Sequence, residues 1–528
     1  MPLAIRVFFI LCLTCSMNLD KITQQYIDLF PGDLSGNLQQ RQTPGVIFST
    51  VETEHFANAQ LLHFNGELAH EIGLGQITNA EDEYFLNAKT QHLNLKTYAT
   101  AYAGHQFGNW AGQLGDGRAI LAGEIRNAAG TSTELQWKGA GATPYSRHAD
   151  GRAVLRSTVR EYLMSEAMHH LGIPTTRSLS ISLTGEDVIR DIMYSGNPRP
   201  EKGALMMRTA ESFLRFGHFE LLSAQRNMEL LSRLVDFTIE IYFPDIQASG
   251  KDKYLEWFKT VSERTADLVV EWMRVGFVHG VMNTDNMSIL GLTIDYGPFA
   301  MLEDYDLNFT SNTTDLPGRR YAFGQQGKMA QWNLWQLANA LFPLINDAEA
   351  LQDVLNHFGD DFWQKHDAML GRKFGFGHLQ EDDEAFFTEW QHQMQDLKLD
   401  YTLFFQKLEY FENIDLADFK EITYGNADEA TFQKLKAFLE QYSDRLRKNT
   451  ITREESRKMM AAANPKFILR NYMLFECIER LDRGDRSMFD QLLSALKVPF
   501  EALYPEFNQK RPEKYNDVAG CSMLSCSS

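Results

Sequence analysis

Apolar and polar positions follow different periods in different parts of the chain. Residues 118–125 form a short apolar run, residues 127–132 carry turn-forming residues, and residues 133–138 alternate as a returning strand would. Between residues 152 and 171 apolar positions recur near helical spacing, and Gly172-Ile-Pro174 ends the segment. The pattern therefore predicts a hairpin followed by a helix.

The rest of the chain is predominantly helical. Residues 178–183 predict one more short strand, and the acidic run at residues 381–384 reads as a solvated loop. From about residue 225 onward helical spacing dominates, most clearly at residues 230–242, 254–275 and 332–341. A strand-rich front followed by a helical body predicts an α+β fold with two lobes.

A chain of 528 residues exceeds the size at which a single hydrophobic core stops growing, so we expect several packed units. We expect a leader or mis-assigned start at residues 1–17, an N-terminal extension at 18–90, a strand-rich lobe at 91–224, the catalytic part of a helical lobe at 225–345, a helical C-terminal extension at 346–515 and a Cys-containing tail at 516–528.

The first residues resemble the core of a signal peptide. Residues 3–15 are strongly apolar, with Arg6 as the only charge, but they are too short to span a bilayer comfortably. No small-residue cleavage pattern follows them, and Met17 reads as a natural start. We expect a dispensable leader or a mis-assigned start, a cytoplasmic protein and no stable membrane association.

Composition narrows the classes of partner. A formal net charge of −19 argues against a general nucleic-acid binder. Between residues 110 and 220, however, Lys and Arg outnumber Asp and Glu by one, which fits either a site for an anionic small ligand or ordinary solvated charges. The five cysteines are too few and too scattered for a disulfide scaffold and indicate a reducing compartment.

Three features of the predicted hairpin and helix together suggest phosphate binding. Gly112-Gln-Leu-Gly115-Asp-Gly117-Arg118 precedes the first strand, and such glycines let backbone N–H groups approach phosphate, although an ordinary tight turn has the same composition. Lys138 ends the second strand, and Glu161 lies in the helix, as in the Lys–Glu pair of protein kinases. Thr158-Val-Arg-Glu161 also matches a helix capping box.

A fourth feature supplies carboxylate and amide oxygens. His279-Gly-Val-Met-Asn-Thr-Asp285-Asn286 matches the kinase catalytic-loop spacing from His to Asn, and Asp295-Tyr-Gly297 stands in for the Asp-Phe-Gly motif. Asn and Asp oxygens suit Mg²⁺ that bridges ATP phosphates. Val281 occupies the position of the kinase catalytic Asp, so Asp285 offers a base that is differently placed. The order of these elements predicts an ATP site.

The motifs also carry a family resemblance from about residue 45 to the carboxyl terminus. The chain resembles the selenoprotein O family, whose members are protein-kinase-like pseudokinases. The matching segments are Tyr102-Ala-Gly-His-Gln-Phe-Gly108, Gln113-Leu-Gly-Asp-Gly-Arg118, Trp137-Lys-Gly-Ala-Gly141, Thr143-Pro-Tyr-Ser-Arg147, Asp150-Gly-Arg-Ala-Val-Leu-Arg156, Arg160-Glu-Tyr162, and the segments at His279–Asn286 and Asp295–Pro298.

This resemblance implies protein adenylylation, in which AMP moves from ATP to Ser, Thr or Tyr hydroxyls with Mg²⁺ or Mn²⁺. It implies that ATP is held in the reverse orientation to that in kinases, that Asp285 is the general base, that Asn286 and Asp295 are metal ligands, and that Glu161 orients Lys138. The residues it implies for nucleotide contact are Gly115, Gly117, Arg118, Lys138, Asp150, Gly151, Arg208, Arg215 and Asp295.

The chain departs from the family at its last residues. Many members carry a Cys-x-x-selenocysteine pair before two final serines, whereas here Cys521 and Cys526 are separated by four residues. Redox control through Cys526 would need Cys521, Cys477 or another protein as its partner.

Other activities stay open at this stage. Ordinary phosphoryl transfer, UMP transfer from UTP, and a non-catalytic pseudokinase that binds nucleotide as a scaffold are the alternatives, and Val281 is the feature that favours the last.

Overall fold

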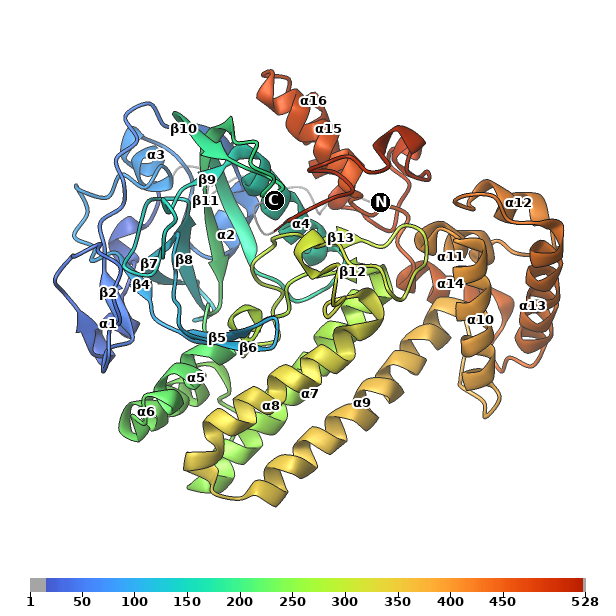
Figure 1. Ribbon diagram of the computed structural model, residues 1–528, viewed down its shortest axis with the longest axis horizontal. Helices are drawn as coiled ribbons and strands as arrows, with labels where there is room; N and C mark the ends of the chain where they lie inside the picture. Colours follow the sequence, from blue (N-terminus) through green and yellow to red (C-terminus); the bar gives the residue numbers. More distant parts are fainter. Residues whose placement is uncertain (1–15, 526–528) are drawn as a thin grey trace, which may run out of the picture.

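The computed structural model describes residues 16–525 and has an α+β fold (Figure 1). Its centre is a nine-stranded mixed sheet in the order β1-β2-β4-β7-β8-β11-β10-β3, with β9 paired beside β11. The strands are β1 (Gly32–Asp33), β2 (Phe48–Thr50), β3 (Gln60–Phe64), β4 (Tyr98–Thr100), β7 (Ala119–Arg126), β8 (Ser132–Lys138), β9 (Ala153–Val154), β10 (Arg177–Arg190) and β11 (Arg199–Ala210).

Burial on both faces explains the apolar run in the middle of this sheet. Only the last residue of β7 is exposed, so nearly every side chain of this strand is packed. The antiparallel register places Lys138, the last residue of β8, opposite Ala119 of β7 and Met206 of β11. The predicted hairpin is confirmed, and the strand predicted at residues 178–183 extends further, to Arg190.

The first part of the described chain joins the same sheet. β1, β2 and β3 pair within it; the helix α1 (Gln25–Leu29) precedes β1, and α2 (Gly66–Glu71) and α3 (Ala80–Leu86) lie between β3 and β4. The indole N–H of Trp137 on β8 donates to the carbonyl of Phe85 at 3.0 Å, which ties α3 to the centre of the sheet. These strands are too short to impose a visible period on the sequence.

The remainder of the chain is helical, as expected, apart from two small strand pairs. β5 (Ala103–Gln106) and β6 (Asn109–Gln113) form a hairpin, and β12 (Phe277–Val278) pairs with β13 (Ala300–Met301). The helices are α4 (Leu155–His170), α5 (Phe216–Ala224), α6 (Met228–Tyr242), α7 (Lys251–Val275), α8 (Gln326–Ile345), α9 (Ala348–Phe374), α10 (Asp383–Leu397), α11 (Tyr401–Glu409), α12 (Leu416–Glu421), α13 (Glu429–Arg447), α14 (Arg453–Ala463), α15 (Asn471–Asp482) and α16 (Ser487–Leu496).

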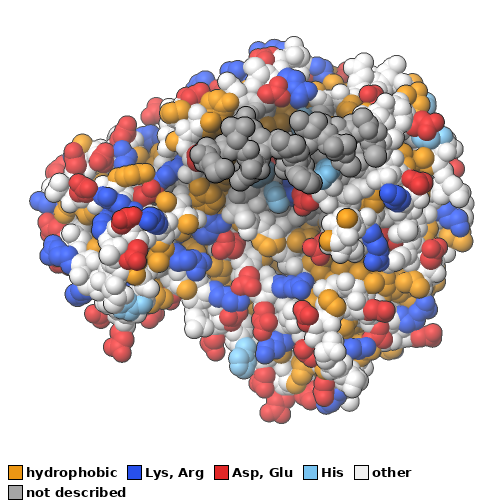
Figure 2. Space-filling model, turned by 180° about the vertical axis from the view of Figure 1, so that it is seen from behind, with side chains coloured by type: hydrophobic (Ala, Val, Ile, Leu, Met, Phe, Trp, Pro, Cys, Tyr) orange, Lys and Arg blue, Asp and Glu red, His pale blue; other side chains and the backbone are white. Residues whose placement is uncertain are grey.

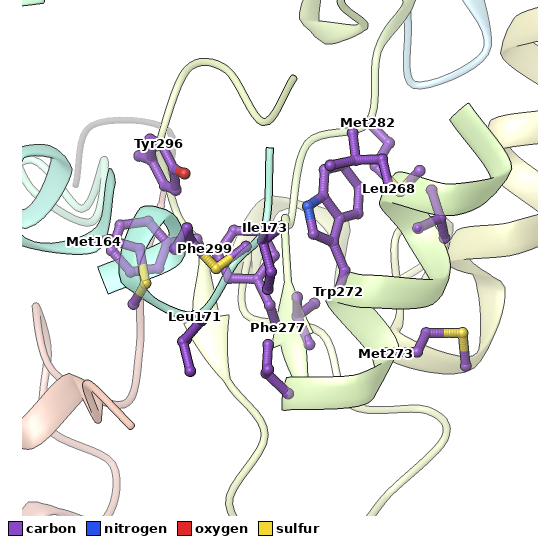
Figure 3. Packing of buried hydrophobic residues seen from close by; sticks show 14 of the residues in the cluster. Met164, Leu171, Ile173, Leu268, Trp272, Met273, Phe277, Met282, Tyr296 and Phe299 are labelled. Carbon is purple, nitrogen blue, oxygen red and sulfur yellow. The ribbon is translucent and has the colours of Figure 1, made fainter. Parts of the chain in front are cut away.

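One continuous core joins the strand-rich and helical regions. α4 packs against β10 and β11, and α15 and α16 return from the far end of the chain to pack on α4 (Figure 1). At the junction, Met164 and Ile173 lie close to Phe277 and Phe299, next to the indole of Trp272 on α7 (Figure 3). Because all of these side chains are buried, the junction is a packed interior that fixes the elements on its two sides.

The solvated loop predicted at residues 381–384 is only partly confirmed: Glu381 and Asp382 form an exposed turn, whereas Asp383 and Glu384 belong to α10. Asp383 begins α10 and is buried, because Arg445 of α13 donates to its two carboxylate oxygens at 2.6 and 2.8 Å. The acidic run therefore contains one member of a buried ion pair whose partner lies 62 residues away.

Charged side chains of both signs are mixed on one face of the molecule (Figure 2). Figure 2 shows Lys and Arg side chains interspersed with Asp and Glu over the face seen from behind. Within residues 16–525, no helix is both long enough and apolar enough to cross a bilayer.

Candidate functional site

The Lys–Glu pair predicted from the sequence forms. The Lys138 ammonium contacts the carboxylate of Glu161, and both side chains are buried. Burial lowers the pKa of Lys138, against the opposing charge of Glu161. The capping-box alternative is wrong, because α4 begins at Leu155 and the Thr158 hydroxyl donates to the Val154 carbonyl inside the helix.

Three cations from three elements meet at one carboxylate. Arg208 of β11 donates to Asp295 Oδ1 at 2.6 Å, Arg215 at the start of α5 contacts Oδ2, and Lys138 Nζ lies 3.7 Å from Oδ1. Burial opposes ionisation of Asp295, but the charges of Arg215, Arg208 and Lys138 outweigh it and hold the pKa of this carboxyl well below its usual range. Asp295 is therefore an anion surrounded by positive charge.

Further contacts fix the directions of these cations. Arg208 also donates to Glu161 Oε1 at 2.9 Å and to Gln136 Oε1 at 2.7 Å, so one guanidinium links β8, β11 and α4. Asp295 itself adopts a positive φ of 56°, a conformation that costs energy for a residue with a side chain. The surrounding contacts hold the carboxylate in this position.

The Asp285–Asn286 turn lies directly beside this cluster. Arg215 donates to the backbone carbonyl of Asp285 at 2.9 Å. Gln106 donates to Asp285 Oδ2 at 3.1 Å, while Oδ1 is buried and has no hydrogen-bond partner among the described residues. Burial raises the pKa of Asp285 to about 6, against the hydrogen bond from Gln106 and the charge of Arg215. The Asn286 amide N–H₂ donates to the Val281 carbonyl at 2.9 Å, which fixes its orientation.

The β5–β6 hairpin forms one wall of this turn. The backbone N–H of His105 donates to Thr284 Oγ1 at 2.7 Å, and that of Phe107 donates to the Tyr321 hydroxyl at 3.0 Å and to Asn283 Oδ1 at 3.2 Å. Gly104 lies against Asp285, and a Cβ added there would stand 2.6 Å from Asp285 Oδ1. Sequence reasoning quoted this segment as a motif but gave Gln106 no role.

The glycine loop is explained by close packing. A Cβ on Gly115 would stand 2.5 Å from the Tyr145 ring and 2.7 Å from the Thr100 carbonyl oxygen, and one on Gly117 would stand 2.9 Å from the Tyr145 carbonyl oxygen. Asp116, between them, accepts from the Thr100 hydroxyl at 2.6 Å and lies 3.8 Å from Arg215, a neighbour that sequence reasoning missed. The loop thus reaches the cation cluster through Asp116.

Of the other predicted nucleotide-contact residues, Arg118 lies next to Lys138, whereas Asp150 and Gly151 contact other parts of the described chain. The charge of Arg118 acts on Lys138, and its carbonyl accepts from Gly139 N–H at 2.7 Å. Asp150 pairs with Arg190 at 2.8 Å, and Gly151 packs on the carbonyl of Gly141. Within residues 16–525, no hydrogen bond or ion pair joins Asp150 or Gly151 to Asp295.

His279, Cys477 and Cys521 are buried in the protein interior. His279 is buried, and its ring lies 3.0 Å from the Ile294 carbonyl oxygen and accepts from the Val281 N–H at 3.3 Å. Cys477 and Cys521 are buried free thiols, and burial raises the pKa of each to about 12. Cys526, the candidate for redox control, lies outside the described residues.

Comparison with known proteins identifies the family. The family described as protein adenylyltransferase SelO matches residues 38–497. A Cytophaga hutchinsonii protein named protein nucleotidyltransferase YdiU is 48% identical over 519 residues, covering 96% of this chain and 99% of the relative. Proteins of the same name are 46% identical in an Azoarcus species, with 96% and 98% covered, and 44% identical in Flavobacterium johnsoniae, with 96% and 99% covered. The resemblance seen in the motifs is confirmed, and the chain belongs to the protein adenylyltransferase SelO family.

Proposed function

We propose that this chain transfers the AMP part of ATP to Ser, Thr or Tyr hydroxyls of other proteins. The observation that carries the proposal is the convergence of Lys138, Arg208 and Arg215 on Asp295, directly beside Asp285 and Asn286. Membership of the SelO family and the nucleotidyltransferase names of the relatives support transfer of a nucleotide to protein.

The fold proposal is a protein-kinase-like arrangement of two lobes. It is supported by the order of a glycine loop, a strand Lys paired with a helix Glu, an Asp-Asn turn and an Asp-Tyr-Gly segment. On this proposal the sheet around Lys138 is the strand-rich lobe, and Asp285 and Asp295 lie in the helical lobe, with a helical extension following from residue 346.

The cation cluster is suited to a triphosphate. Arginine forks can donate two parallel hydrogen bonds to phosphate oxygens, and Lys138 adds a compact charge. With ATP bound in the reverse of the kinase orientation, the α-phosphate would face the attacking hydroxyl. Further nucleotide contacts are proposed from Gly115, Gly117, Arg118, Asp150 and Gly151.

A divalent metal fits the residues beside this cluster. The Asn286 side chain is oriented by its N–H₂ group, and within residues 16–525 no donor is recorded on its amide oxygen. Asp295 is ionised, and 21% of its side chain is exposed, so it can accept a further ligand. Asn286 and Asp295 would hold Mg²⁺ or Mn²⁺, and the bound ion would neutralise charge on the phosphates.

Asp285 is proposed as the general base. Its Oδ1 has no partner in the described residues, and Gln106 occupies Oδ2, so one oxygen is left to accept the proton of the acceptor hydroxyl. The attacking hydroxyl oxygen would then form a bond to the α-phosphorus, and pyrophosphate would leave. Lys138, Arg208 and Arg215 would stabilise the charge that develops on the phosphate oxygens.

The test is to follow each phosphorus separately. The purified chain is incubated with protein acceptor and ATP labelled on the α- or the γ-phosphate, in parallel with an Asp285→Asn variant. We expect α label on protein, no γ label, and no label with the variant. Protein-bound γ label would indicate a kinase, and ATP binding without label transfer would indicate a scaffold. α-Labelled UTP, run alongside, separates UMP transfer from AMP transfer.

A further inference from the structure

An exposed surface rich in aromatic and basic side chains borders the Asp285 turn. Trp110 at the tip of the β5–β6 hairpin and Trp335 on α8 are each 46% exposed. On α8, Lys328, Trp332 and Trp335 are spaced as i, i+4 and i+7, so they form one stripe along the helix. We call Trp110, Arg319, Arg320, Lys328, Trp332 and Trp335 the aromatic–basic surface.

Tilted and edge-to-face ring contacts join these parts into one surface. The His105 ring lies 5.0 Å from that of Trp110 and 5.5 Å from that of Trp332, measured between centroids. The Arg320 guanidinium lies over the Trp332 ring at 4.4 Å. The hairpin, α8 and the segment before α8 are therefore in contact, as their neighbouring positions in Figure 1 also indicate.

The same surface is continuous with the catalytic turn. His105, whose ring stands between the two tryptophans, donates its backbone N–H to Thr284, and the next residue, Gln106, donates to Asp285. Tyr321, next to Arg320, donates its hydroxyl to Asn283 Oδ1 at 2.6 Å. A protein whose hydroxyl is to reach Asp285 therefore has this surface as a neighbour.

The charge of this surface contrasts with that of the chain. Residues 101–115 and 316–346 contain no Asp or Glu, whereas Arg319, Arg320 and Lys328 contribute positive charge, in a protein of net charge −19. Glu220 approaches the surface, but it is buried and paired with His105 at 2.6 Å. Exposed aromatics and arginine are the residue types that dominate binding energy at protein interfaces.

We propose that the aromatic–basic surface docks the acceptor protein and selects hydroxyls flanked by acidic residues. The aromatic rings would pack on apolar side chains of the acceptor, and Arg319, Arg320 and Lys328 would attract its acidic side chains. This inference rests on the proposed protein-modifying function, and it names the chemistry of the substrate at that site.

Binding of two synthetic peptides tests the proposal independently of catalysis. Each fluorescently labelled peptide carries one central Tyr, flanked by Glu and Asp in one peptide and by Lys and Arg in the other. Their affinities are measured by anisotropy with the full chain in the presence of a non-hydrolysable ATP analogue. We expect the acidic peptide to bind at least about tenfold more tightly at low salt, and this preference to shrink as salt is added.

Charge reversal locates the site. The double variant Arg319→Glu and Lys328→Glu should remove the preference for the acidic peptide, and Trp110→Ala should weaken both peptides. The matched control, Lys434→Glu and Lys436→Glu, makes the same change in net charge at two exposed positions of α13 and should bind as the unmodified chain does. ATP affinity should be unchanged in all three variants.

Three outcomes would overturn the surface. The first is equal binding of the two peptides, and the second is an equal loss of peptide preference in the control variant. The third is a dimer in sedimentation analysis that only the Arg319 and Lys328 reversals dissociate, because the surface would then be a contact between two copies of the chain. If the acidic peptide binds as expected but accepts no α label, the docking surface stands and the proposed transfer fails.

Discussion

Two buried clusters of arginine and carboxylate illustrate how a site differs from a structural ion pair. At Asp295, three cations from distant elements meet one carboxylate whose side chain is 21% exposed. At Asp400, Arg470 donates to both carboxylate oxygens at 2.8 and 3.0 Å, and the Asp400 side chain is completely buried. Both clusters pair arginine with carboxylate, but the Asp400 side chain is fully buried and the Asp295 side chain is partly exposed.

The number of charges does not separate the two clusters. In the Asp400 cluster Glu303 lies 3.7 Å from Arg470 and contacts Arg511, so two carboxylates face two arginines. Around Asp295, three cations likewise face three carboxylates, those of Asp295, Glu161 and Asp116. The clusters differ in access: a fully buried group holds helices together, whereas a partly exposed one can receive a further ligand.

The difference between the two clusters is tested most directly by replacing Asp295. Asp295→Ala should lower AMP transfer by at least about 1,000-fold, because it removes both a proposed metal ligand and the carboxylate that orients Arg208 and Arg215. The fold should stay intact, since Arg208 keeps Glu161 and Gln136. Transfer of α label and circular dichroism measure the two effects. Full activity in a folded Asp295→Ala protein would refute the assignment.

The corresponding substitution in the Asp400 cluster should lower stability. Asp400→Ala leaves the buried Arg470 without its main partner, so the free energy of unfolding should fall by roughly 3–5 kcal/mol. Denaturant unfolding gives this value, and activity per folded molecule at low temperature should be close to that of the unmodified chain. A large loss of activity without a loss of stability would place Asp400 in the catalytic machinery.

A smaller effect is expected where the hairpin touches the proposed base. In Gly104→Ala the added methyl group would stand 2.6 Å from Asp285 Oδ1, so the carboxylate must shift by a fraction of an ångström or more. Because small displacements of a catalytic group are costly, transfer should fall by roughly 100-fold with unchanged ATP affinity. Gly359→Ala, on α9, where an added Cβ would meet only the Gln331 side chain at 3.6 Å, is the control and should retain the activity.

A contact of the site could be predicted from the sequence when its two residues lie close together along the chain. Lys138 and Glu161 are 23 residues apart on two periodic elements, and their pairing followed from the order of the motifs. Gln106 and Asp285 are separated by 179 residues, and nothing local in a short hairpin shows that its glutamine faces a distant aspartate. The role of Arg208 and Arg215 came only from the family resemblance.

The secondary-structure elements also differ in how well the sequence predicts them. Long elements such as α7 and the β7–β8 hairpin could be predicted from the spacing of their apolar positions. β1 and β2 are only two and three residues long, which is too short to show such a spacing, so they can be recognised only in the folded sheet. Asp383 was misread as solvated because its partner, Arg445, lies on another helix. Tertiary partners decide the role of a charged residue, and single-sequence patterns do not contain them.

A further effect is expected in the pH dependence of stability near the Asp295 cluster. Burial, reinforced by the charge of Arg215, lowers the pKa of His218 from 6.5 to about 3 in the folded protein. Below pH 6.5 the unfolded chain binds a proton that folded His218 cannot, so stability falls as the pH decreases toward about 3, by roughly 1.4 kcal/mol per pH unit. His218→Asn keeps an acceptor for the Arg215 N–H and removes this titration. Its melting temperature should therefore fall less steeply between pH 6.5 and 4 than that of the unmodified chain, and parallel curves for the two proteins would show that His218 is not held neutral by the fold.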